Sequence, residues 1–173
     1  MNQQASSSEF GEMIHCARQL LIELLAHSHS FIRDKTLSES APDLPPEDKA
    51  LYFQIIKSQT YLGLALTFCK YSEFHARYRR LLSPELAEKS NAINSRIKKS
   101  KILDLRNKFV GHLLDAKTGK PLPPQKIGEY YGSILGPDTE DQFNKWWWSS
   151  FSDRHSGNSM AATLFQIMCS SGR

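Results

Sequence analysis

Three long stretches in which apolar residues recur every three or four positions constrain the fold more than any other feature of the sequence. They run from Phe10 to Phe31, from Leu51 to Leu82 and from Leu86 to Phe109. This spacing is typical of helices that bury one apolar stripe. No stretch alternates apolar and polar residues between hairpin turns. The sequence therefore predicts an all-α protein, an antiparallel bundle of three helices that each exceed about 25 residues.

Local signals place the ends of these helices. The first helix is expected from about residue 7 to about Lys35, and a polar, proline-broken loop over 38–46 precedes the second. Ser83-Pro84-Glu85 supplies a capping hydroxyl, a first-turn proline and an acid at the positive end of the third helix. We expect that helix to continue without a break to about Asp115, before a proline-rich segment.

The chain of 173 residues is predicted to form a single domain, with a helical core over about 8–115 and an extension over about 124–173. Short helices are expected in the extension over 125–135, after the Thr139 cap and over 160–169, with a loop over 152–159. Adjacent rings on a helix point in three directions, so at least one ring of Trp146-Trp147-Trp148 should be exposed or face a partner. Packing on the bundle is the favoured interpretation, and a base-stacking platform or dimer contact is the alternative.

Charge and cysteine content set the class of protein. The formal net charge is +4 and the isoelectric point is about 9.0, which permits an acidic partner such as RNA but does not require one. No apolar run approaches the length of a membrane span and the start lacks a secretory pattern, so a cytoplasmic protein without membrane contact is expected. Cys16, Cys69 and Cys169 are widely spaced, which is typical of buried thiols and builds no zinc motif.

Metal binding and nucleotide chemistry find little support. Glu12 and His15 have the spacing of a di-iron bundle motif, but the chain offers no second copy of that motif. His27 and His29 point to different sides of a helix and are expected at the surface. No glycine-rich phosphate loop and no nucleophile elbow occurs, so no cofactor and no metal are predicted.

The segment Leu103–Leu114 places a cation and an imidazole among apolar residues. On a continuous helix His112 falls close to the apolar stripe, while Arg106 shares an angle with apolar neighbours on a second face. An imidazole can move a proton to or from ribose and leaving oxygens, and a guanidinium can hold a phosphate. A helix with two apolar faces indicates a second chain, which would bring two such pairs together.

These residues resemble a known family signature. Arg106-Asn107, followed by four residues and His112, is similar to the Arg-x(4 to 6)-His motif of HEPN (higher eukaryotes and prokaryotes nucleotide-binding) domains. The resemblance implies a dimeric bundle that cleaves RNA without metal, as in toxin–antitoxin and abortive-infection systems. His112 would then be the acid or base, Arg106 the phosphate ligand and Asn107 the polar residue that orients RNA or the histidine. Leu114 stands where members paired with a nucleotidyltransferase antitoxin often have Tyr, so the sequence does not favour that antitoxin as a partner.

A band of basic residues precedes the motif and is the candidate RNA-binding surface: Arg96, Lys98, Lys99, Lys101 and Lys108, with Arg77, Arg79 and Arg80 expected nearby. The same band supports the main alternative, a non-catalytic helical module that dimerises and binds RNA or a partner protein.

Overall fold

The structure, a computed structural model, describes residues 7–40, 45–100, 102, 132, 138–148 and 153–170. The described part consists of helices joined by short connections, and it contains no strand. This confirms the predicted all-α class. The elements are α1 (Ser7–Ser40), α2 (Pro46–Tyr78), the 3-10 turn η1 (Arg79–Leu81), α3 (Pro84–Lys99), α6 (Glu140–Trp147) and α7 (Met160–Cys169).

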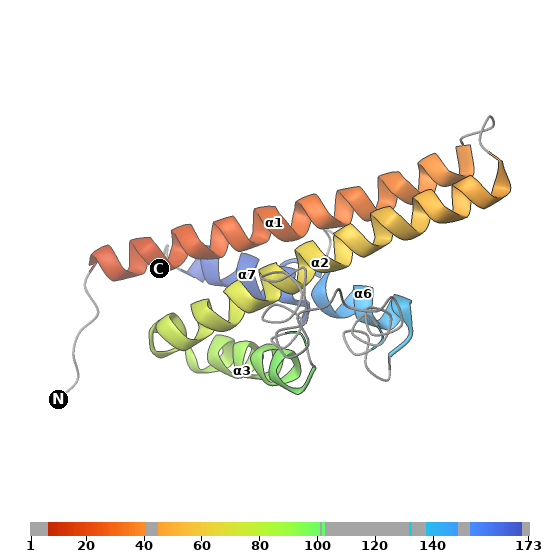
Figure 1. The fold of residues 1–173 in the computed structure, drawn as a ribbon. Helices are drawn as coiled ribbons and strands as arrows, with labels where there is room; N and C mark the ends of the chain where they lie inside the picture. Colours follow the sequence, from red (N-terminus) through yellow and green to blue (C-terminus); the bar gives the residue numbers. More distant parts are fainter. Residues whose placement is uncertain are drawn as a thin grey trace, which may run out of the picture.

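Two long antiparallel helices form the frame of the molecule (Figure 1). α1 and α2 lie side by side, and the end of the pair that joins them projects beyond the shorter helices. α3 folds back along the second half of α2, and α7 packs against both α1 and α3. None of the described helices combines the length and the apolar character that a bilayer crossing requires.

The second half of α2 is the centre of the core. Its buried residues include Phe68, Tyr71 and Phe74 together with Cys69, and Cys69 lies about 140° around the axis from Phe74. α1 covers one side of α2 with four buried residues: Met13, Ala17, Leu20 and Leu24. α3 packs on another part of α2, and Phe143 and Trp146 of α6 pack on Phe68, while outward side chains of α2 such as Arg77 stay exposed.

The third helix is shorter than the sequence predicts. Ser83 caps α3 as expected, since its side chain accepts a hydrogen bond from the Leu86 amide, and Pro84 begins the helix. The helix ends at Lys99, because Ser100 has extended angles (φ −74°, ψ 150°) and its hydroxyl donates to the Ile97 carbonyl at 2.7 Å. The predicted continuous helix from residue 84 to Asp115 is therefore wrong at Ser100.

Other boundaries agree with the sequence or differ by a few residues. α1 continues to Ser40, so the predicted loop over 38–46 is wrong at its first three positions, and α2 begins within it at Pro46. The capping box of Thr139 and Gln142 is present at the start of α6. α7 spans the predicted 160–169. The helix predicted over 125–135 lies outside the described residues, apart from Gly132.

None of the three adjacent tryptophans is exposed. Trp147 is buried, while Trp146 and Trp148 are half-buried. α6 ends at Trp147, and Trp148 has extended backbone angles, so its ring leaves the helical direction and packs 6.1 Å from the Trp147 ring. Trp146 packs on Phe68 at 5.2 Å between ring centroids. The interpretation that this segment packs on the bundle is confirmed.

A buried hydrogen bond between α2 and α3 allows a direct test of this packing. The Tyr71 hydroxyl donates to Ser90 Oγ at 3.0 Å, and burial raises the pKa of Tyr71. We expect Tyr71→Phe to lower the free energy of unfolding by about 1–2 kcal/mol, because Ser90 is left without its partner. Adding Ser90→Ala should cost less than the sum of the two single changes, as measured by urea unfolding. Strictly additive effects would contradict the bond.

Candidate nucleic-acid interface

The residues predicted to bind or cleave RNA fall into two groups. Arg96, Lys98 and Lys99 occupy the last turn of α3 and are described. The others lie outside the described residues: Lys101, Arg106, Asn107, Lys108 and His112. The described site is therefore the surface on which α3 ends, together with the part of α6 that packs beside it.

Arg96 is held in a fixed position at this surface. Its guanidinium lies over the Trp146 ring, 4.1 Å from the ring centroid, and forms an ion pair with the Asp138 carboxylate. Partial burial lowers the pKa of Arg96, and the nearby Asp138 carboxylate opposes that shift. An arginine remains protonated at neutral pH even so. About a third of the side chain stays accessible (36%). The guanidinium can therefore stack on an incoming base while Trp146 supports it from behind.

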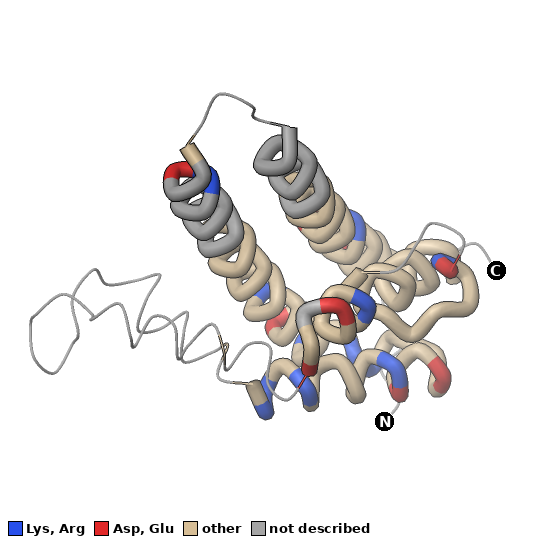
Figure 2. Tube along the Cα trace, turned by 90° about the vertical axis from the view of Figure 1, so that its right-hand side faces the viewer, with Lys and Arg blue, Asp and Glu red and all other residues tan. Residues whose placement is uncertain are grey.

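Lys98 and Lys99 differ from Arg96 in being exposed. Figure 2 shows basic positions gathered toward the C-terminal end of α3 and acidic ones toward its start. This distribution complements the helix dipole, which favours acids at the start and cations at the end. It also leaves two mobile ammonium groups beside the fixed guanidinium of Arg96, a combination suited to an anionic backbone.

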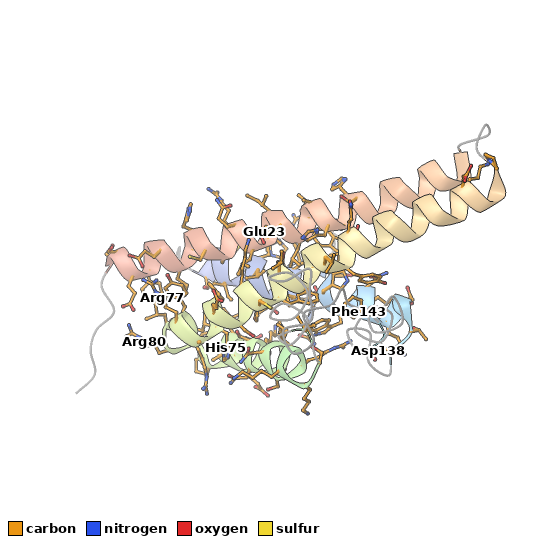
Figure 3. All side chains as sticks on the ribbon, viewed as in Figure 1. Glu23, His75, Arg77, Arg80, Asp138 and Phe143 are labelled. Atoms are coloured by element: carbon orange, nitrogen blue, oxygen red, sulfur yellow. The ribbon has the colours of Figure 1, made fainter. Side chains whose placement is uncertain are left out.

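The second basic group lies elsewhere. Arg77 pairs with Glu12 at 2.8 Å and Arg80 pairs with Glu9, which places both beside the first turns of α1 (Figure 3). The hydrogen bond between His75 and Asn91 sets an antiparallel register of α2 and α3. In that register Lys98 lies opposite the middle of α2, about 14 Å along the axis from Arg77. Arg77, expected near the band, therefore lies toward the start of α3 rather than beside its last turn.

Two open grooves border the stacked pair of Trp146 and Arg96. One, of about 500 Å³, lies between α3 and the loop before α7 and is lined by Glu85, Glu88, Lys89, Ala92, Ile93, Arg96, Trp146 and Asn158. The other, of about 850 Å³, lies on the far side of Trp146 and is lined by Asn144, Lys145, Trp146, Trp148, Asp153, Gly157, Asn158 and Ser159. The linings combine amide, amine and aromatic groups with the carboxylates of Glu85, Glu88 and Asp153, so only part of this surface suits an anionic chain.

A polar cluster between α1 and α2 was missed by the sequence reasoning. His27, expected at the surface, is half-buried, and its Nε2 lies 3.3 Å from the Thr67 hydroxyl. That hydroxyl donates to Glu23 Oε2 at 2.9 Å, and the other oxygen of the same carboxylate accepts from Lys70. Gly63 makes room for the ring, because a Cβ there would lie 2.3 Å from His27 Cε1. A glycine inside an apolar helix was the only signal in the sequence.

Glu12 and His15, the weak metal-ligand pair of the sequence, do not converge on a site. Glu12 accepts hydrogen bonds from Arg77 and, at 3.5 Å, from the Tyr78 hydroxyl. His15 is exposed. In the part of the chain that is described, no group of histidine, cysteine and acidic residues is arranged to hold a metal ion.

Comparison with known proteins supplies no relative for this chain. No family model, no curated protein and no solved structure matches it.

The two kinds of cation at the end of α3 should respond differently to mutation. We expect Arg96→Ala to lower the free energy of unfolding by about 1–2 kcal/mol, because it removes both the ion pair and the stacking on Trp146. Lys98→Ala removes the same charge from an exposed position and should change stability by less than about 0.5 kcal/mol. Urea unfolding of the two variants measures the difference, and equal effects would mean that Arg96 is not held as described.

Stability should depend on pH through His27. Burial lowers the pKa of His27 below its ordinary value of 6.5, with Lys70 adding to the shift and Glu23 opposing it. As the pH falls below 6.5, His27 is protonated in the unfolded chain while it is still neutral in the folded protein. The free energy of unfolding should therefore fall with pH until the pH passes the lowered pKa of the folded state. His27→Gln should remove this part of the loss between about pH 7.5 and 5. His29→Gln, at an exposed position, is the control and should keep it.

Proposed function

We propose that this chain is a metal-independent endoribonuclease of the HEPN type that acts as a homodimer. The observation that carries the proposal is the sequence Arg106-Asn107, followed by four residues and His112, set among apolar residues in an all-α protein. RNA supplies its own nucleophile, so this chemistry needs a proton carrier and a phosphate ligand but no cofactor. A cytoplasmic role in a toxin–antitoxin or abortive-infection system, with an antitoxin as partner, belongs to the same proposal.

The proposed reaction is an internal transfer at phosphorus. The ribose 2′-hydroxyl attacks the adjacent phosphorus as His112 removes its proton, and the bond to the 5′-oxygen breaks. The 5′-oxygen takes a proton from the other histidine of the dimer, which leaves a 2′,3′-cyclic phosphate and a 5′-hydroxyl. Arg106 binds the phosphate oxygens while charge builds on them, and Asn107 orients the RNA or the imidazole.

The surface at the end of α3 supports RNA as the substrate. Lys98 and Lys99 are exposed there, a few residues before Arg106 in the sequence. Arg96, fixed on Trp146, adds a planar cation of the kind that stacks on unpaired bases. These groups would bind the strand on either side of the bond that is cut.

The alternative is a non-catalytic helical module that dimerises and binds RNA or a partner protein. The same fixed Arg96 favours it, because the surface at the end of α3 is equipped for binding without any contribution from the Arg106–His112 pair. Retention of RNA would then persist without cleavage, and it would weaken as salt is added.

A cleavage assay tests the proposal. Purified protein and a structured RNA are incubated with excess EDTA, beside Arg106→Ala, His112→Ala and the control His29→Ala. We expect the wild type and the control to yield fragments that end in 2′,3′-cyclic phosphate. Each of the other two variants should lose at least about a hundredfold in rate, because a positioned acid or base and a positioned ligand of the developing charge each contribute about that much.

The assay also separates the two functions. Absence of cleavage by the wild type, or cleavage that survives His112→Ala, overturns the ribonuclease assignment. RNA retention that is equal in the wild type, Arg106→Ala and His112→Ala, with no cleavage in any of them, supports the binding module. Lys98→Ala in the same retention assay should weaken binding without loss of stability.

A further inference from the structure

The face of α3 that lines the smaller of the two grooves changes character along its length. Glu85, Glu88, Lys89, Ala92 and Arg96 follow one another at spacings of three, one, three and four, so they form one strip along the helix. They line the groove of about 500 Å³ between α3 and the loop before α7, a volume within the range of small-molecule sites. The groove therefore has carboxylates toward the start of α3 and a guanidinium toward its end.

Three of these charged groups are already engaged within the protein. Lys89 pairs with Glu85 at 3.0 Å and donates to the Gln166 side-chain oxygen at 3.0 Å. The charge of Arg96 is balanced by Asp138. What Arg96 offers to a ligand is therefore the flat face of its guanidinium and not an unpaired charge.

Glu88 is the carboxylate that remains for a ligand. It is exposed, and within the described part of the chain no hydrogen bond or ion pair engages it. Ala92 lies between Glu88 and Arg96 on the strip and contributes only a methyl group, which leaves space in the groove above it. Asn158, from the loop before α7, is exposed on the same groove, and its amide also has no partner among the described residues. Two acceptor oxygens, an amide and a stacking plane thus border one space.

A carboxylate beside a stacking plane discriminates between the bases of RNA. Its two oxygens accept two neighbouring N–H groups, and guanine alone presents such a pair on its Watson–Crick edge, at N1 and N2. Adenine and cytosine present one donor beside an acceptor nitrogen, which a carboxylate repels. Uracil presents one donor between two carbonyl oxygens. An unpaired guanine is therefore the base whose edge complements Glu88.

We propose that this groove binds one unpaired guanine of an RNA strand, with the base stacked on the Arg96 guanidinium and its N1–H and N2–H groups donating to the Glu88 carboxylate. The Asn158 amide would donate to the guanine O6. Lys99, exposed and three positions after Arg96, would bind an adjacent phosphate. This inference rests on RNA as the ligand, as in the proposed function, and it makes Glu88 the residue that determines which base is bound.

Binding of short single-stranded 2′-O-methyl oligonucleotides to the wild-type chain tests the proposal. These probes lack the 2′-hydroxyl nucleophile, so they are bound without being cleaved. Each is an oligoadenylate of about ten nucleotides with guanosine, inosine or adenosine at its centre, and fluorescence anisotropy measures its affinity. We expect the guanosine probe to bind at least about tenfold more tightly than the adenosine probe. Inosine, which keeps N1–H but lacks the N2 amino group, should fall between them.

Two glutamine variants of the same helix separate base recognition from charge. Glu88→Gln replaces an acceptor oxygen with an amide that opposes the guanine donors, so the guanosine preference should fall to about twofold or less. Glu85→Gln is the matched control, because it removes the same charge from a carboxylate that Lys89 already binds, and it should keep the preference. The readout is a ratio of affinities, so the general gain that follows the loss of one negative charge cancels. Both positions are exposed, and circular dichroism checks the folding of both variants.

The stacking plane is tested separately. Arg96→Lys keeps the positive charge beside Asp138 but removes the planar group, and it should weaken binding of the guanosine probe about tenfold. Added salt should weaken the binding of every probe while the preference for guanosine persists, because the base contacts release no counterions.

Three outcomes overturn the proposal: equal binding of the guanosine and adenosine probes, an equal loss of preference in Glu85→Gln and Glu88→Gln, or no binding of any probe. The result is independent of cleavage. Glu88-dependent preference in a protein that does not cleave RNA would support this site and reject the ribonuclease. Cleavage that depends on His112, without any preference for guanosine, would reject this site and support the ribonuclease.

Discussion

The aromatic side chains of α2 are the interaction on which the rest of the structure depends. Phe68 is completely buried, with Phe143 at 6.1 Å and Trp146 at 5.2 Å between ring centroids. Because α2 carries buried residues on several sides, α1 alone cannot cover it, and α3, α6 and α7 must pack around the remainder. The tryptophan-rich segment is therefore part of the core, although it begins 68 residues after the end of α2 in the sequence.

The same packing determines what the end of α3 presents to solvent. Trp146 packs against Phe68 and Phe143, so its ring is a rigid support for the guanidinium of Arg96. Asp138, just before α6, fixes the guanidinium from the side. A flexible arginine would lose side-chain entropy on binding a strand, whereas Arg96 has already lost it on folding. The core thus pre-organises one binding group and leaves Lys98 and Lys99 free to adapt.

The fold class and the helix boundaries could be predicted from the sequence where the signal is local. Helical periodicity predicted the all-α class, and capping hydroxyls at Ser83 and Thr139 marked helix starts that the structure contains. The break at Ser100 has no such signal, because the surrounding lysines and arginine favour helix. It follows from packing: on a continuous helix Ile97 and Ile102 would lie about 140° apart, yet both are fully buried. The cluster around His27 likewise depends on contacts between two helices, which one stretch of sequence cannot reveal.

One side chain of α7, Gln166, contacts both the loop before α7 and helix α3. The Gln166 amide donates to the Gly157 carbonyl at 2.9 Å and to the Arg154 carbonyl at 3.4 Å, which positions the loop that carries Arg154. Its oxygen accepts a hydrogen bond from Lys89 of α3 at 3.0 Å. Gln166 of α7 therefore positions the loop before its own helix and braces α3 at the same time, so the two contacts depend on each other.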